Sequence, residues 1–383
     1  MRLRAEIGVL PLLSGCASPG VRGWFVELQG YVASMDGAAV VGASVTLSDL
    51  EGKLLAELDT GPDGGWSLVM LVHEPLGNHL KMEVSADDYS PGLAWYDINL
   101  EAGDPSLLVA GPGQTFNTLF RRLTTLRLAE AADRAQAVGV VVDGLTGVPV
   151  PGLDLAVQRG WNAPIGEPAV SSALTGPDGA FSFEVDEPGV YTVSVNEFAG
   201  YAYSRFPAWA TLDGRRSVGV VLPPTEAGEL RAAVVWDGQI QDVDLHLGAY
   251  RPDGWHTSEG NRFHLWAGEP TLLSGGEVHA EITRSAADGR GPESLAVYQQ
   301  PSRSPIQLTV VDNDHLEESA PGGLAAATVQ VQVWYGEDIP RYYVVSPDMV
   351  GTWWRPVSLS VTAVSYVVEE WGAGIDPAED GAF

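Results

Sequence analysis

Apolar and polar residues alternate over short runs along most of the chain, which is the pattern of β-strands with one buried face. Clear examples are residues 41–47, 138–142, 180–185 and 327–334. The runs are bounded by Gly, Pro and Asp, the residue types that favour turns. Helical composition is confined to residues 129–136, which are too few for more than a linker. The pattern therefore predicts an all-β protein.

One turn sequence occurs twice in the chain. Thr-Gly-Pro-Asp-Gly at residues 60–64 returns at residues 175–179, with alternating runs before and after each copy. In such a segment Pro fixes φ at one turn position, and Gly accepts the positive φ that follows. We therefore expect two related units, each built from several short strands around this hairpin turn.

The order of motifs within each unit is a Gly-containing strand, a second strand, the Pro-Asp-Gly turn and a closing strand such as residues 189–195. This order resembles the carboxypeptidase regulatory-like domain, whose members are small transthyretin-like or Ig-like β-sandwiches. The resemblance covers residues 24–130 and 136–224, and it implies two tandem sandwiches. It implies a fold and transfers no activity.

A segment rich in Pro and Gly, residues 222–228, marks the boundary to a third unit. Its motifs are a strand ending in Trp236, Asp-Val-Asp-Leu-His-Leu at 242–247, Gly-Pro-Glu at 291–293 and Gly-Thr-Trp-Trp at 351–354. This ordered set resembles the YfaP-like domain of exported bacterial proteins over residues 228–371, and implies a third β-sandwich domain without an established activity. Residues 372–383 are acidic and rich in Gly and Ala, and we expect a flexible tail there.

Cys16, the only cysteine, follows the apolar residues 7–13 and the positively charged Arg2 and Arg4. Positive charge, a short apolar stretch and small residues in this order are typical of an export signal. The segment resembles the lipobox of bacterial lipoproteins, although Glu6 departs from it by placing a charge at the edge of the apolar stretch. The resemblance implies that residues 1–15 are a signal peptide that is removed, and that Cys16 is acylated.

An acylated Cys16 makes the membrane a partner of the protein, with residues 16–23 as the tether. Each buried acyl methylene contributes about 0.8 kcal/mol, so two or three chains hold a protein on a bilayer without a spanning helix. Ala17, in place of Asp, resembles the pattern that lets lipoproteins proceed to an outer membrane. We predict an exported, lipid-anchored protein of the outer membrane or cell surface of a Gram-negative bacterium. The alternative is a wrongly assigned start followed by an ordinary buried thiol.

The charge balance disfavours nucleic acid as a partner. The 21 basic side chains are outnumbered by 50 acidic ones, which gives a formal charge of −29, and a field of this sign repels phosphate backbones. A single cysteine also excludes a disulfide within the chain. Stability must therefore come from packing.

Asp242, Asp244 and His246 form the most suggestive polar set. They alternate along a predicted strand, so their side chains share one face. Two carboxylates and an imidazole on one face predict a metal site, and hard oxygen ligands favour calcium. The alternative is a strand whose polar face meets solvent or holds a hydrogen-bonded histidine, because calcium takes six to eight oxygens and only two carboxylates are local.

Four tryptophans of the third unit are candidate ligand-binding residues: Trp255, Trp266, Trp353 and Trp354. Exposed Trp rings on β-sandwiches bury apolar area against a sugar while the rim makes hydrogen bonds. Adjacent residues of a strand point to opposite faces, so at least one of Trp353 and Trp354 is expected to face outward. The alternative for each ring is the core.

Motifs of nucleophilic, zinc-dependent or nucleotide-binding enzymes do not occur in the sequence. We predict a non-enzymatic cell-envelope protein in which the first two sandwiches act as a stalk and display a C-terminal binding domain to an envelope protein or a glycan. One alternative is a carbohydrate-binding module that uses the exposed Trp residues of the third unit. The other is a metal-dependent hydrolase accessory, with His246, His264 and nearby acids of perturbed pKa.

Overall fold

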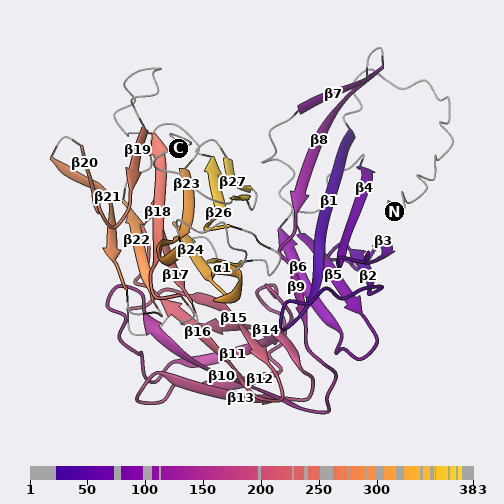
Figure 1. The fold of residues 1–383 in the computed structure, drawn as a ribbon, viewed down its shortest axis with the longest axis horizontal. Helices are drawn as coiled ribbons and strands as arrows, with labels where there is room; N and C mark the ends of the chain where they lie inside the picture. The colour runs from indigo at the N-terminus through magenta and orange to yellow at the C-terminus, as the bar shows by residue number, and fades with distance from the viewer. Residues whose placement is uncertain are drawn as a thin grey trace.

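The structure of the protein is a computed structural model. It describes residues 23–72, 79–97, 106–111, 114–196, 200–226, 228–236, 240–250, 262–274, 276–287, 289, 291–298, 306–315, 323–336, 340–345, 349, 351–360, 363–367 and 370–372. Within these residues nearly all regular structure is strand, and the helical pieces are the single turns η3 (Asn313–His315) and α1 (Gly323–Ala326). No helix in this part of the chain is long and apolar enough to cross a membrane. The predicted all-β class of packed sandwiches is confirmed (Figure 1).

Sandwich 1 consists of two facing sheets near the amino terminus. The first sheet has the order β4 (Gly65–Val72), β1 (Gly23–Ser34), β8 (Gln114–Arg122) and β7 (Ser106–Gly111), with β9 (Leu126–Leu128) beside β1. The second has the order β3 (Leu54–Asp59), β2 (Ser44–Ser48), β5 (His79–Ser85) and β6 (Gly92–Asp97). Most strands pair antiparallel, but β1 pairs parallel with β8 and β9.

Sandwich 2 repeats this strand order. Its sheets are β13 (Ala180–Val185), β10 (Ala135–Asp143) and β16 (Arg215–Val221), and β12 (Ser171–Leu174), β11 (Asp154–Arg159), β14 (Gly189–Val195) and β15 (Ser204–Ala210). The first strand again pairs antiparallel with the strand that follows the turn, and parallel with the last strand. Apart from β7, which has no counterpart among the described strands of sandwich 2, the two sandwiches share one topology.

The repeated turn explains this shared topology at the level of hydrogen bonds. In sandwich 1 the Thr60 hydroxyl donates to the carbonyl of Val40 at 2.6 Å and accepts from the amide of Ala43 at 2.9 Å. The Thr175 hydroxyl makes the equivalent pair in sandwich 2, to Val150 and from Leu153, both at 2.8 Å. Each buried Thr thus joins the turn to the loop between the first two strands of its sandwich.

A glycine and an aromatic ring also occupy equivalent places in the two sandwiches. Gly30 lies opposite Trp66, and Gly139 lies opposite Phe181. A Cβ atom at Gly30 would lie 2.5 Å from the Trp66 ring, and one at Gly139 would lie 2.4 Å from the Phe181 ring. The rings therefore pack over backbone that only glycine leaves open.

Sandwich 3 is larger. One sheet has the order β20 (Thr271–Ser274), β21 (Glu277–Arg284), β22 (Glu293–Val297), β17 (Leu230–Val235), β24 (Gln330–Tyr335) and β25 (Arg341–Val344). The other has the order β19 (Arg262–Leu265), β18 (Val243–Tyr250), β23 (Ile306–Asp312), β26 (Trp353–Ser360) and β27 (Ala363–Val367), with β28 (Glu370–Gly372) beside β26. Apolar residues of both sheets, including Trp236 and Trp354, form its core.

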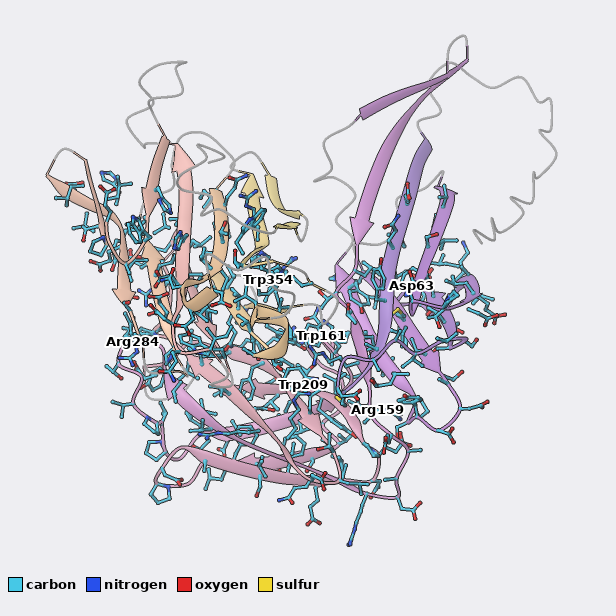
Figure 2. All side chains as sticks on the ribbon, in the orientation of Figure 1. Asp63, Arg159, Trp161, Trp209, Arg284 and Trp354 are labelled. Atoms are coloured by element: carbon cyan, nitrogen blue, oxygen red, sulfur yellow. The ribbon has the colours of Figure 1, made fainter. Side chains whose placement is uncertain are left out.

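Sandwiches 1 and 3 both rise from sandwich 2, which forms the base of the molecule (Figure 1). One apolar cluster contains residues of all three: the core of sandwich 1, Trp161 and Trp209 of sandwich 2, and Tyr342 and Val344 of sandwich 3. Trp161 lies where the three meet (Figure 2), and its ring contacts that of Tyr342 edge-on with centroids 4.7 Å apart. Arg215 donates to the carbonyl of Met35 at 2.8 Å and to the Thr328 hydroxyl at 2.6 Å, which links sandwich 2 to both neighbours.

The junction of sandwiches 2 and 3 is held by a buried glutamine as well as by apolar packing. Val220 and Leu222 pack against Val235 and Trp334 in one cluster. Gln332 of β24 is 0% exposed. Its amide accepts from the backbone N–H of Val220 at 3.0 Å and donates to the carbonyl of Arg205 at 2.7 Å.

These contacts correct the expectation of a linear stalk. Sandwich 3 does not extend beyond sandwiches 1 and 2, because β24 and β25 pack directly on sandwich 2 and Tyr342 joins the cluster shared with sandwich 1. The three sandwiches form a folded-back frame instead.

We predict that the Thr175→Val substitution lowers the stability of sandwich 2 by about 1–3 kcal/mol, because it leaves the carbonyl of Val150 and the amide of Leu153 buried without the hydroxyl. Thr60→Val should have a similar effect on sandwich 1, since its hydrogen bonds are equivalent. Thermal unfolding followed by circular dichroism measures both. The control is Thr271→Val, at an exposed strand position; an equal effect there would contradict this account of the turn.

Candidate functional site

Asp244 and His246 of the predicted polar set lie on β18 of sandwich 3, where alternate residues face opposite sides, and Asp242 directly precedes this strand. Val243, Leu245 and Leu247 point into the core and are fully buried. Asp244 and His246 lie on the other face, and yet they are only 3% and 1% exposed. Their shared face was correctly expected from strand alternation, whereas their burial was not.

Asn313 joins the two carboxylates of this set. Its side-chain amide donates to Asp244, and its nitrogen also lies 3.5 Å from an oxygen of Asp242. Asp314, next along the chain, accepts from the backbone amides of Gln241 at 2.6 Å and Asp242 at 3.2 Å. Burial and the nearby charge of Asp244 raise the pKa of Asp242. The amide of Asn313 thus lies between the carboxylates, in the space that a bridging cation would need.

His246 is part of a row of rings that crosses from β18 to β19. Its Nδ1 lies 2.9 Å from Nε2 of His264, and its Nε2 lies 3.9 Å from Asp244. The ring of His264 stacks nearly parallel on that of Trp266, with centroids 6.1 Å apart. Within the residues that the structure describes, Nε2 of His246 has no hydrogen-bond partner. This arrangement matches the alternative of a hydrogen-bonded histidine on a strand.

Glu293 is a buried member of the site that the sequence reasoning missed. It comes from β22 of the facing sheet, is 1% exposed, and accepts a hydrogen bond from the backbone amide of Leu245 at 2.5 Å. Burial, and next the charge of Asp244, raise its pKa to about 9. The available signal was its place in the Gly-Pro-Glu motif at residues 291–293, at the start of a mostly apolar run. The carboxyl group ties the two sheets of sandwich 3 together beside β18.

The metal prediction receives no support from this geometry. In the described ranges there is no group of three or more His, Cys, Asp or Glu side chains arranged to hold a metal ion. Asp244 and His246 lie together, whereas Asp242 joins them through Asn313. Calcium binding by Asp242, Asp244 and His246 stays a prediction.

The four candidate tryptophans do not form one binding surface. Trp354 is 0% exposed in the core of sandwich 3, so its assignment as a ligand-binding residue is corrected (Figure 2). Trp353 faces the other way and is half-buried, with the Arg355 guanidinium 5.4 Å from its ring centre. Trp266 is half-buried beside His264, and Trp255 lies outside the described residues. Trp266 directly follows β19, whereas Trp353 lies on β26, and β18 and β23 lie between these two strands.

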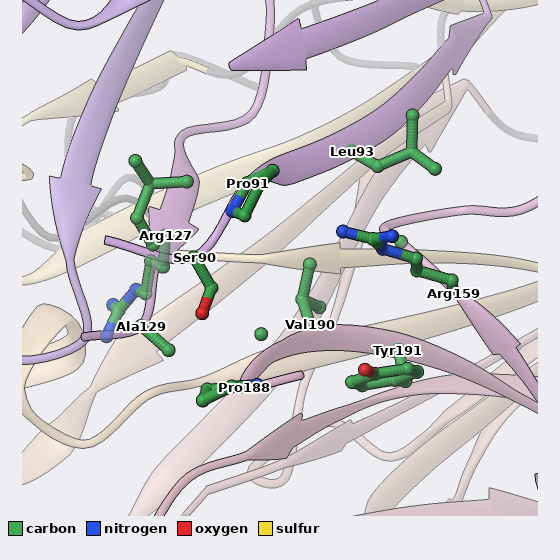
Figure 3. A pocket seen from close by; sticks show the side chains of 13 residues that line it. Ser90, Pro91, Leu93, Arg127, Ala129, Arg159, Pro188, Val190 and Tyr191 are labelled. Atoms are coloured by element: carbon green, nitrogen blue, oxygen red, sulfur yellow. The ribbon is translucent and has the colours of Figure 1, made fainter. Parts of the chain in front are cut away.

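A small cavity lies at the junction of sandwiches 1 and 2 (Figure 3). It is lined by residues 90–93 and 127–129 of sandwich 1, and by residues 159–160 and 188–191 of sandwich 2. Its volume is about 10 Å³, which is room for at most a single water molecule. This cavity is therefore too small for a ligand larger than water.

Comparison of the sequence with known protein families and with curated proteins finds no related protein. No family model matches the chain, and no curated protein matches it. The resemblances to the carboxypeptidase regulatory-like domain, the YfaP-like domain and the lipobox therefore stay predictions.

Comparison with solved structures gives distant likenesses to other β proteins. The shaft pilin SpaA of Lactobacillus rhamnosus GG is 12% identical with a TM-score of 0.19, over 52% of this chain and 98% of the pilin. A streptococcal ancillary pilin is 13% identical with a TM-score of 0.19, over 51% of this chain and 62% of that one. A DUF3823 family protein from Parabacteroides merdae is 12% identical with a TM-score of 0.19, over 47% of this chain and 90% of that protein. Scores this low carry no argument about function.

We predict that Glu293 makes the protein less stable as pH rises. Its carboxyl group holds a proton in the folded state up to a pKa of about 9, whereas its ordinary value is 4.5. Between these values unfolding releases that proton, so the free energy of unfolding falls by up to about 1.4 kcal/mol per pH unit. Glu293→Gln keeps an acceptor for Leu245 and removes the titration. Its stability relative to wild type should therefore rise between pH 5 and pH 8.

Urea unfolding at the two pH values measures this difference. Glu184→Gln, at an exposed position of β13, is the matched control for the loss of a carboxyl group elsewhere in the protein. Parallel pH profiles of the wild type and Glu293→Gln would show that the buried carboxyl group does not titrate in this way.

Proposed function

We propose that this chain is a non-enzymatic protein of the cell envelope, anchored by lipid at Cys16, in which three β-sandwiches form one rigid frame that displays sandwich 3. The observation that carries the proposal is the packing of both outer sandwiches on sandwich 2. This packing rests on an apolar cluster that contains residues of all three sandwiches, and on the buried side-chain amide of Gln332 between sandwiches 2 and 3. Such a frame holds its surfaces at fixed positions, which suits display and binding.

The position of Cys16 supports an anchor next to the frame. It precedes Gly23, the first residue of β1, by seven residues (23 − 16). A chain extends by at most about 3.6 Å per residue, so this tether spans at most roughly 25 Å. An acyl group at Cys16 would therefore keep sandwich 1 close to the bilayer. We place the protein at the outer membrane or cell surface of a Gram-negative bacterium.

The polar set of sandwich 3 supports a structural role more than a catalytic one. Asp244 and His246 are 3% and 1% exposed, so a substrate does not reach them in this structure. The perturbed pKa of Glu293 has a structural cause, because the same burial places its carboxyl group on the backbone of β18. Among the described residues of the hydrolase alternative, the imidazole of His246 and the carboxylate of Asp244 are therefore out of reach as a general base and acid, although His264 is partly exposed.

The charge of the protein restricts its partners. With a formal charge of −29, the surface disfavours nucleic acid and other polyanions. An envelope protein or a neutral glycan remains as the class of partner for the displayed surface, beside the membrane at Cys16.

We predict that cells expressing the protein incorporate labelled palmitate into it, and that Cys16→Ser abolishes the labelling because the acceptor sulfur is removed. The fraction of protein that sediments with membranes should fall in parallel. Ser14→Ala, two positions before the cysteine, is the matched control and keeps the thiol. Equal labelling of wild type and Cys16→Ser would contradict the anchor.

A further inference from the structure

A larger hollow lies at the seam between sandwiches 2 and 3. Its volume is about 310 Å³. The lining residues of sandwich 3 are Arg231, Glu281, Ile282, Thr283, Ala296 and Tyr298. Leu145 of sandwich 2, which follows β10, contributes to the wall as well.

The register of three strands explains why the surface is hollow here. Arg231 of β17 pairs with Ala296 of β22, and Ala296 pairs with Glu281 of β21. These residues form one row across the sheet, in which a methyl group lies between two long side chains. Neighbouring strands are about 4.8 Å apart, so Arg231 and Glu281 form opposite walls and Ala296 forms the floor.

The charged groups of both walls are held in place by the protein itself. The Tyr298 hydroxyl donates to the carboxylate of Glu281 at 2.5 Å. The Arg231 guanidinium donates to the carbonyl of Pro223 at 3.3 Å and lies 3.5 Å from the carboxylate of Glu229. A ligand would therefore meet side chains that are already oriented, which lowers the entropy lost on binding.

The wall from sandwich 2 is fixed in the same way. The Ser294 hydroxyl of β22 donates to the carbonyl of Gly144 at 2.7 Å. Arg284, at the end of β21, donates to the carbonyl of Thr146 at 3.1 Å. These two bonds flank Leu145 in the chain and hold it against sandwich 3, so the hollow depends on the junction of the two sandwiches.

We propose that this hollow binds a neutral sugar ring. A sugar presents hydroxyl groups around its rim and an apolar face of C–H groups. Arg231 offers donors, Glu281 offers acceptors, and Tyr298, which is 37% exposed, offers an aromatic ring. The volume lies at the small end of the range of about 300–1,000 Å³ for ligand pockets, so it suits one or two sugar units.

Other small ligands fit less well. An anion would meet the carboxylates of Glu229 and Glu281 beside the one guanidinium. This inference rests on the proposed function, because it gives the neutral glycan a site on sandwich 3, but a failure to bind sugar would leave the lipid anchor and the frame untouched.

The test is saturation-transfer NMR of the full chain with glucose, galactose, mannose and N-acetylglucosamine, each titrated through the millimolar range. At least one sugar should give a saturable signal. Tyr298→Ala removes the ring, and Ala296→Leu fills the floor, so each should weaken the apparent affinity by about tenfold or more. Leu174→Ala, at an exposed position of β12 in sandwich 2, is the control and should bind as wild type does.

Two results would overturn the proposal. One is the lack of a saturable signal with all four sugars. The other is binding that Tyr298→Ala leaves unchanged, which would place any sugar site elsewhere on the protein. Circular dichroism establishes whether each variant folds. If Ala296→Leu does not fold, Tyr298→Ala still tests the proposal, because Tyr298 is partly exposed and its replacement disturbs the core less.

Discussion

The structure depends on the packing of sandwiches 1 and 3 on sandwich 2. The backbone N–H of Val220 and the carbonyl of Arg205 are removed from water by sandwich 3, and the amide of Gln332 replaces the water at both groups. Separation of the sandwiches at this junction would expose Val220, Leu222 and Trp334 together. Because apolar area and paired polar groups are lost at the same time, the junction favours one fixed arrangement over a flexible string of domains.

The two repeated sandwiches were predictable because their determinants are local. Thr60 and Thr175 act within their own turns, and strand alternation specifies which side chains face the core. No local sequence pattern indicates which residues make the contacts between sandwiches. Gln332 lies in a run of alternating apolar residues, and Tyr342 carries no motif, yet they hold the frame because residues distant in sequence lie beside them. The prediction that sandwiches 1 and 2 form a stalk with sandwich 3 beyond them was wrong for this reason.

The polar set of sandwich 3 shows the same division between local and distant determinants. Alternation places Asp244 and His246 on one face and indicates that Trp353 and Trp354 point apart. Which tryptophan enters the core depends on the register of β26 on β23, where Val310 pairs with Trp354. The sequence did not predict that Glu293 belongs to this site, because its carboxyl group contacts β18 from the facing sheet. A strand pattern specifies faces, but the neighbour that covers each face is set by the tertiary fold.

The rigid frame is tested most directly by the distance between sandwiches 1 and 3 in solution. Spin labels at Lys53→Cys and Leu273→Cys, both at exposed positions, in a Cys16→Ser background allow this distance to be measured by pulsed electron paramagnetic resonance. A single narrow distribution is predicted, because sandwich 2 holds both neighbours. A broad distribution, or several separate maxima, would show that the sandwiches move independently and would contradict the account.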